Sequence, residues 1–346
     1  MIGLVTGLSG QDTRPILDDV GYCWNPQQLE RFMDYLKSTA PAPAEPSTPM
    51  PPLLAGISPH DDYLYAGRVY YQLFPKITAP EVVIFGVTHR APRLKMGDLQ
   101  NKLVFDEYSY WQGPYGKIAV SPLREYLKNN LDPQWTITSN EGHAMEHSIE
   151  GMLPFLHYFN RTVRITPIMV TAMPLETMTE VSEKLARVLA TYMQEKNLQP
   201  GKDIFFLISC DANHYGKDFA NTVFGEDEKA HQLGTDQDRH LAEAYLSGEV
   251  TFEKIKGLTA GLWGQTYKEN SNTLWCGKYS VPFGLLTVSH LKKILAPTQT
   301  LTGNILLYTD TYSEGTLPVK KTGMGITAVF SLKHWVGFFA AGFFLN

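Results

Sequence analysis

Two uninterrupted apolar runs, each of which ends at a histidine, constrain this chain more than any other feature. Residues 53–57 lead into His60, and residues 82–87 lead into His89. Apolar runs of this length without alternation are typical of strands that are covered on both faces. Residues 67–74 leave room for a helical crossover, so we expect a β-α-β unit with two parallel, neighbouring strands. Both imidazoles should then lie at the carboxyl edge of the sheet, where α/β folds bind ligands.

A third apolar run leads into a polar cluster in the same way. Residues 203–209 read as a buried strand, and Cys210, Asp211 and His214 follow directly. Further strands are expected at residues 163–170, 304–308 and 325–330. The strands at residues 53–57, 82–87 and 203–209 would therefore each lead into a histidine or into a cluster of aspartate and histidine.

Helical patterns separate these strands. Residues 27–36 follow an asparagine N-cap and a proline, and their apolar side chains form one stripe. Residues 175–195 have the apolar spacing of a long amphipathic helix. The pattern predicts a single α/β domain with a central, mostly parallel sheet and helices on both faces. Shorter helices are expected at residues 239–246, 251–258 and 282–294. The aromatic stretch 101–120 is expected to form a hairpin or an excursion over the sheet edge.

No boundary divides the chain, so residues 1–346 are expected to form one domain with two appendages. Residues 1–51 hold an N-terminal helix and a connector, because residues 41–52 contain six prolines. Residues 331–346 form an apolar tail, which is shorter than the about 20 residues that span a membrane. We expect this tail to be a strand or helix buried on the body, or a contact in a homo-oligomer, and we expect no membrane partner.

Composition argues against several functional classes. A net charge of −5 with scattered basic residues disfavours a nucleic-acid partner. Three distant cysteines, Cys23, Cys210 and Cys276, do not suggest a disulfide framework and favour a reducing compartment. Residues 1–12 lack the features of a signal peptide, so a cytoplasmic protein is expected. The sequence also has no dinucleotide fingerprint, phosphate-binding loop or serine-hydrolase elbow.

A metal site is one interpretation of the histidines at the strand ends. Imidazole suits Zn, Cu and Fe, and a third ligand that leaves one position open would make the site catalytic. Cys276 is the best local candidate for that ligand, because Gly277 after it allows close backbone approach. The alternative is that Cys276 is a small buried hydrophobic residue, the commonest fate of a free cysteine.

Two further clusters have acid/base potential. The carboxylate of Asp211 could orient His214, whose usual pKa lies near neutrality. The alternative is a capped turn, since Asp and Asn are favoured there. Glu146, His147 and Glu150 are equally ambiguous: on a helix the two glutamates would share a face and His147 would point elsewhere.

Five segments, taken together, resemble the Memo family, which is also called AmmeMemoRadiSam system protein B. That family is similar in fold to class III extradiol ring-cleaving dioxygenases. The segments follow the family's order and lie within residues 14–329. They are ISPHDDYLYAG (57–67), GVTHRAP (86–92), EHSIEGMLPF (146–155), SCDANHYG (209–216) and WCG (275–277).

The resemblance implies roles for particular residues. Cysteine stands where the dioxygenases have a carboxylate ligand. This chain departs from the family where Asp61-Asp62 replaces a small pair, where Arg90 replaces the second histidine of a pair, and where two extra residues precede Pro282. Residues 217–236 have no counterpart. The matched metal-ligand positions are His60, His89 and Cys276, and the matched pocket residues are Asp211, His214 and His147.

Three functions follow as expectations. The first is a metal-dependent redox or oxygenase-type enzyme that acts on a small molecule, with Fe, Cu or Zn as the transition metal and a pocket histidine that handles a proton. A thiolate in place of a carboxylate softens the site and argues against ordinary ring cleavage.

The second expectation is a non-catalytic module that binds a peptide or small ligand in the cleft, because some family members are described as phosphopeptide or signalling adaptors. Asp61-Asp62 disfavours an anionic ligand near His60. The third expectation is a zinc-dependent hydrolase with His214 or Glu146 as the base.

Overall fold

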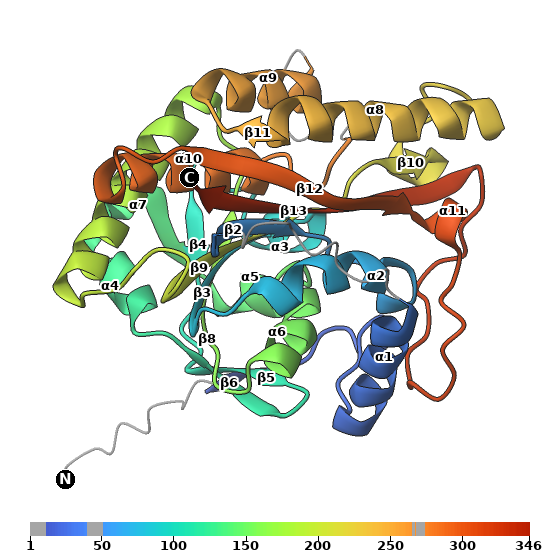
Figure 1. Ribbon diagram of the computed structural model, residues 1–346, viewed down its shortest axis with the longest axis horizontal. Helices are drawn as coiled ribbons and strands as arrows, with labels where there is room; N and C mark the ends of the chain where they lie inside the picture. The colour runs from blue at the N-terminus through green and yellow to red at the C-terminus, as the bar shows by residue number, and fades with distance from the viewer. Residues whose placement is uncertain (1–11, 40–50, 265–266, 268–273) are drawn as a thin grey trace, which may run out of the picture.

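The computed structural model describes residues 12–39, 51–264, 267 and 274–346. Within these residues 13 strands form one mixed sheet. Figure 1 shows how the sheet and the helices are arranged. The strands are β1 (Thr13–Arg14), β2 (Leu53–Ser58), β3 (Glu81–Val87), β4 (Leu103–Phe105), β5 (Tyr110–Gly113), β6 (Gly116–Val120), β7 (Thr136–Thr138), β8 (Arg164–Val170), β9 (Ile204–Ser209), β10 (His214–Gly216), β11 (Gly248–Glu249), β12 (Leu301–Asp310) and β13 (His334–Leu345). The main path is β1-β5-β6-β8-β3-β9-β2-β13-β12-β11; β4 and β10 pair with β8 and β13, and β7 pairs with β4.

The centre of the sheet is parallel and covered on both faces. The strands β6, β8, β3, β9 and β2 run in one direction. Within β3, Val83 and Phe85 belong to one hydrophobic core, whereas Val82 and Ile84 belong to the other. Side chains of a strand point alternately to the two faces, so an uninterrupted apolar run is what two cores require.

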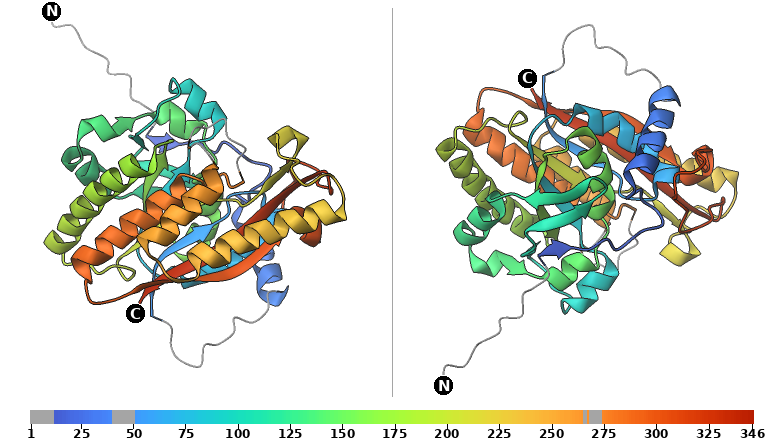
Figure 2. Two further views of the ribbon diagram at one scale, coloured as in Figure 1. Left: turned by 90° about the horizontal axis from the view of Figure 1, so that it is seen from above. Right: turned by 90° about the horizontal axis from the view of Figure 1, so that it is seen from below.

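Helices lie on both faces of the sheet (Figure 2). The helices α7, α9 and α10 lie side by side on one face, and α1, α2 and α6 cover the other. This confirms the expected α/β class. The helices are α1 (Pro26–Thr39), α2 (Tyr63–Leu73), α3 (Arg90–Lys95), α4 (Leu123–Asn130), α5 (Asn140–Ala144), α6 (Leu153–Phe159), α7 (Leu175–Glu195), α8 (Glu228–Leu246), α9 (Phe252–Trp263), α10 (Ser280–Leu295) and α11 (Thr311–Glu314).

The strands that precede the two histidines are parallel but are not neighbours. β9 lies between β2 and β3 and pairs with both. The prediction of an adjacent pair was wrong in this respect, because a crossover connection does not require that its two strands pair. The insertion of β9 brings Asp211 between the two histidine-bearing strand ends.

The apolar tail forms a central strand. β13 is antiparallel to β2 on one side and to β12 on the other, and its interior residues are buried. Of the alternatives expected for the tail, the structure shows a strand buried on the body. The strand expected at residues 325–330 is absent from the structure, because none of these six side chains is buried and Val329 is 82% exposed.

Several other boundaries differ from the predictions. The helix expected at residues 239–246 begins at Glu228, where the carboxylate of Asp227 accepts the N–H of Ala230 and caps the helix. The hairpin expected within residues 101–120 is formed by β5 and β6. No helix in the described part of the chain combines the length and apolar character needed to cross a bilayer. Two expectations concern segments that lie mainly outside the described residues. They are the lack of signal-peptide features in residues 1–12 and the proline-rich connector at residues 41–52.

Candidate metal centre

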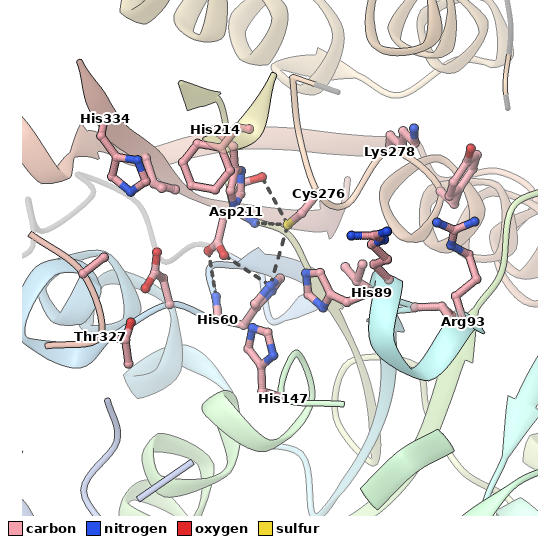
Figure 3. A pocket seen from close by; sticks show the side chains of 18 of the residues that line it. His60, His89, Arg93, His147, Asp211, His214, Cys276, Lys278, Thr327 and His334 are labelled. Carbon is pink, nitrogen blue, oxygen red and sulfur yellow. Dashed lines mark hydrogen bonds and ion pairs between the residues drawn. The ribbon is translucent and has the colours of Figure 1, made fainter. Parts of the chain in front are cut away.

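The carboxyl ends of three neighbouring strands meet at one cavity of about 440 Å³ (Figure 3). His60 comes two residues after the end of β2, His89 two residues after β3, and Asp211 two residues after β9. Cys276 reaches the cavity from the turn before α10. The parallel centre of the sheet therefore delivers side chains from distant parts of the sequence to one point.

A hydrogen-bond chain fixes the ring orientation of His60. Its Nδ1 atom lies 2.7 Å from Oγ of Ser209, whose hydroxyl donates to the carbonyl oxygen of Ser148 at 2.7 Å. Since this hydroxyl has one proton, Nδ1 of His60 must be the donor and Nε2 is left with its lone pair. Burial, with the nearby His89, lowers the pKa of His60 well below its usual value, so the ring is neutral.

Glu146 orients His89 in a similar way. Its carboxylate accepts Nδ1–H of the ring and the backbone N–H of His89, each at 2.8 Å. It also accepts the N–H of Ser148 at 2.8 Å. Burial lowers the pKa of His89, but the charge of Glu146 and the hydrogen bonds to Cys276 and Glu146 outweigh it and raise the pKa to about 10. An ion that binds at Nε2 must displace a proton there.

The sulfur of Cys276 faces both imidazoles. Its Sγ atom lies 3.7 Å from Nε2 of His60 and accepts the N–H of Asp211 at 3.0 Å. Ligand atoms of His60, His89 and Cys276 all lie within 4.8 Å of one another. This position differs from that of a cysteine packed only among aliphatic side chains. Burial raises the pKa of the Cys276 thiol well above its usual value.

The chemistry of this donor set fits a transition metal. Two imidazole nitrogens and one sulfur suit Zn, Cu or Fe, and all three side chains line the cavity. Among the described residues two other sets of side chains could hold an ion, but each shares His89 or Cys276 with the first and uses a carboxylate that already accepts a backbone N–H group. The other sets are His89, Glu146 and His147, and Asp211, His214 and Cys276.

The three residues predicted to line the pocket all do so. His214 donates Nδ1–H to the carbonyl of Ala212 at 2.9 Å, which leaves Nε2 free to accept a proton. Burial, with the nearby His89, lowers the pKa of His214 to about 4, although the bond to Ala212 opposes this. Burial raises the pKa of Asp211 to about 7, and Oδ2 of this carboxyl lies 3.2 Å from Nε2 of His60. Below this pKa Asp211 is protonated, and with His60 neutral the contact is then a hydrogen bond from the Asp211 carboxyl to Nε2 of His60.

His147 lies in the pocket because its segment is not a helix. α5 ends at Ala144, and the chain from Met145 to Ile149 is irregular. The His147 ring stacks on His89 with centroids 4.6 Å apart and an interplanar angle of 9°. Burial and the charge of His89 lower the pKa of His147 to about 4. The helical alternative, in which Glu146 and Glu150 share a face, is therefore wrong.

Sequence reasoning missed two walls of the cavity. Arg90, Arg93 and Lys278 are basic residues that line it, and Arg93 and Lys278 lie on one side (Figure 3). On the other, the ring of His334 stacks on Phe219 at 4.8 Å and on Phe330 at 5.3 Å. Phe219 falls in the stretch 217–236 and His334 in the tail, two segments to which no role was assigned. The apolar character of the tail was the signal that it would be buried.

The Asp61-Asp62 pair divides between two environments. Asp62 is 2% exposed, and its Oδ2 atom accepts the N–H and the hydroxyl of Thr327 at 2.7 and 3.0 Å. Asp61 lines the cavity. One carboxyl of the pair, not two, therefore faces a ligand near His60.

Comparisons with known proteins agree on one family. A family model described as Memo-like protein matches residues 20–312. A MEMO1 family protein of Methanosarcina barkeri is 29% identical over 241 residues, which cover 68% of this chain and 74% of that relative. One from Saccharolobus islandicus is 33% identical over 165 residues, 46% of this chain and 52% of the relative, so this match spans about half of its length. One from Aquifex aeolicus is 28% identical over 204 residues, 58% and 67% of the two chains.

Proposed function

The chain belongs to the Memo family, as its five motifs predicted, and on this premise we propose that it is a metal-dependent redox enzyme. Its mononuclear centre would be held by His60, His89 and Cys276. The substrate would be a small molecule that enters the cavity, and the setting would be a reducing, cytoplasmic one that keeps the thiol ligand available.

The convergence of these three side chains supports the proposal most strongly. They come from three separate parts of the sequence, yet their ligand atoms lie within 4.8 Å of one another. Each imidazole also has a partner for Nδ1, Ser209 for His60 and Glu146 for His89. Such partners fix which nitrogen of a ligating histidine is available to a metal.

The residues around the centre would position a substrate and move a proton. A bound transition metal would supply redox chemistry at the open position. Nε2 of His214 is free to accept a proton, and the raised pKa of Asp211, caused by burial, leaves a carboxyl that can donate one near neutral pH. The stacked rings of Phe219, His334 and Phe330 offer an apolar wall for a planar part of the substrate.

Metal content tests the proposal. Protein purified anaerobically, with reductant and without chelator, should carry close to one equivalent of Fe, Cu or Zn by elemental analysis. Cys276→Ser and His60→Ala should each lower this content, whereas Cys23→Ser, which changes a cysteine outside the cavity, should not. Metal at background level in the wild-type protein would remove the basis of the proposal. Oxygen uptake with a panel of reducing small molecules, lost in His214→Gln, would establish turnover.

A binding module for an anionic ligand is a second candidate, because three basic residues line the cavity. The Nε atom of Arg93 is buried and has no hydrogen-bond partner among the described residues. Only Asp61 of the acidic pair opposes a negative charge. A fluorescent phosphopeptide should then bind more tightly than its unphosphorylated form, and Arg93→Ala should remove the difference while the exposed Arg187→Ala does not.

A zinc-dependent hydrolase is a third candidate that the same donor set supports. Two histidines, one cysteine and an open position form a known catalytic zinc arrangement. His214 would be the base, because its Nε2 is unprotonated. Ester, amide and phosphate substrates with added zinc would reveal this activity, and its absence across the panel together with a redox-active native metal would exclude it.

A further inference from the structure

A second thiol lies beside Cys276. The Sγ atom of Cys210 lies 3.2 Å from the carbonyl oxygen of Asp211, and Sγ of Cys276 lies 3.5 Å from the same oxygen. Cys210 is completely buried, whereas Cys276 is partly exposed and lines the cavity. The two sulfurs therefore approach the same backbone oxygen.

Gly277 permits this approach. A Cβ atom at this position would lie 2.5 Å from both Cβ and Sγ of Cys210 and 2.9 Å from the carbonyl oxygen of Ser209. Any larger residue would push the turn that carries Cys276 away from β9. The backbone of residue 277 therefore packs directly on the Cys210 side chain, which places the neighbouring residue 276 within reach of the second sulfur.

The third cysteine, Cys23, lies in different surroundings from Cys210 and Cys276. Sγ of Cys23 lies near the carbonyl oxygens of Thr322 and Asn25, at 3.5 and 3.7 Å, and does not line the cavity. A small oxidant that enters the cavity meets the Cys276 sulfur first, with Cys210 directly behind it. A solvent-accessible cysteine beside a second cysteine that can resolve its oxidised form is an arrangement found in redox-sensing proteins.

We propose that Cys210 and Cys276 form a disulfide when a peroxide enters the metal-free site. In the first step, the Cys276 sulfur takes the distal oxygen of hydrogen peroxide; the O–O bond breaks, a sulfenic acid forms, and one water leaves. In the second step, the Cys210 sulfur attacks the sulfenic sulfur; an S–S bond forms, the S–O bond breaks, and the hydroxide leaves with the Cys210 proton as a second water. The two sulfurs are oxidised by two electrons in total, and the peroxide is reduced by two.

The disulfide would remove the sulfur donor from the metal centre. A bound ion would in turn protect Cys276, because its sulfur would be coordinated. This consequence rests on the proposed function, but the disulfide itself does not, so the two are measured separately.

Intact mass of the full chain tests the disulfide. Metal is removed with a chelator under anaerobic conditions, and the protein is treated with one equivalent of hydrogen peroxide. We expect a loss of about 2 Da, reversed by dithiothreitol, and a proteolytic fragment in which Cys210 is joined to Cys276. Cys23→Ser should behave as the wild type. Cys210→Ser should show no loss and should instead gain oxygen in steps of about 16 Da at Cys276.

If Cys210→Ser fails to fold, the disulfide-linked fragment of the wild-type protein still shows which cysteines are joined. Cys210→Ala provides a second variant. Oxygen addition to the wild type without loss of mass, a linkage that involves Cys23, or the same mass loss in Cys210→Ser would overturn the proposal. Binding of added zinc by the oxidised and the re-reduced protein is then measured. Disulfide formation with no zinc binding in either form would contradict the proposed metal centre and leave the disulfide established.

Discussion

The Nδ1 atom of His89 lies 2.8 Å from Oε1 of Glu146, and the backbone N–H of the same histidine donates to the other carboxylate oxygen. A buried carboxylate thus fixes both the main chain and the ring at the end of β3. The ring is held with its other nitrogen towards Cys276, the orientation that a metal ligand requires.

Glu146→Gln should weaken metal binding by about 10- to 100-fold, because an amide cannot accept all three of the N–H groups that the carboxylate accepts. Competition with a coloured chelator measures the affinity. Glu141→Gln is the matched control, since Glu141 lies in α5 and its side chain is 63% exposed. Equal affinities of the two variants would show that Glu146 does not orient a ligand.

Asp238 should make stability depend on pH. Its carboxyl is buried and accepts Trp275 Nε1–H at 2.8 Å and the Tyr308 hydroxyl at 2.8 Å, which ties α8 to the residue before Cys276. Burial raises its pKa from 3.8 to about 7, although these hydrogen bonds lower it. Between these two values only the folded state holds the proton, so the free energy of unfolding should fall as pH rises through this window.

Asp238→Asn stays neutral and should lack this component. Urea unfolding at about pH 5 and about pH 8 should show a larger loss of stability with rising pH in the wild type than in the variant. Asp236→Asn, an exposed change in the same helix, should follow the wild type. A parallel pH dependence of Asp238→Asn and wild type would show that the carboxyl is ionised throughout.

The ion pair of Arg14 with Glu150 should be important for stability. Arg14 is 1% exposed and also donates to the carbonyls of His143 and Glu146, at 3.1 and 2.7 Å. Arg14→Met leaves the buried Glu150 carboxylate without its cation and should cost about 3–5 kcal/mol of unfolding free energy. Adding Glu150→Gln should recover part of this loss, because no charge remains.

Arg187→Met breaks an exposed helical pair with Glu183 and should change stability by less than about 1 kcal/mol. Urea unfolding measures all of these variants. An equally small effect of Arg14→Met would show that backbone donors alone satisfy Glu150, since Leu17 and Asp18 also donate to it.

The sequence made the strand ends predictable, because an apolar run and the histidine after it are local features. The tail was predictable as a buried element for the same reason. The partners of the histidines were not, since Ser209 is 149 residues from His60 and Glu146 is 57 residues from His89. No periodicity encodes such pairs, which arise when strands distant in sequence become neighbours.

Other errors had similar causes. The order β2-β9-β3 depends on how two connections cross the sheet, which strand patterns do not specify. Residues 325–330 have the composition of a strand, but they pair with no other strand, and Ile326 and Phe330 pack against the core while only partly buried. The position of His147 depends on where α5 ends, and the segment was ambiguous between a helix and a turn.

X-ray absorption at the metal edge of the anaerobic, metal-loaded protein tests the central claim most directly. We predict one sulfur at about 2.3 Å together with imidazole nitrogens at about 2.0–2.1 Å, and loss of the sulfur signal in Cys276→Ser with the nitrogens retained. A bound metal surrounded by nitrogen and oxygen alone, or a sulfur signal that persists in Cys276→Ser, would contradict the assignment of His60, His89 and Cys276 as its ligands.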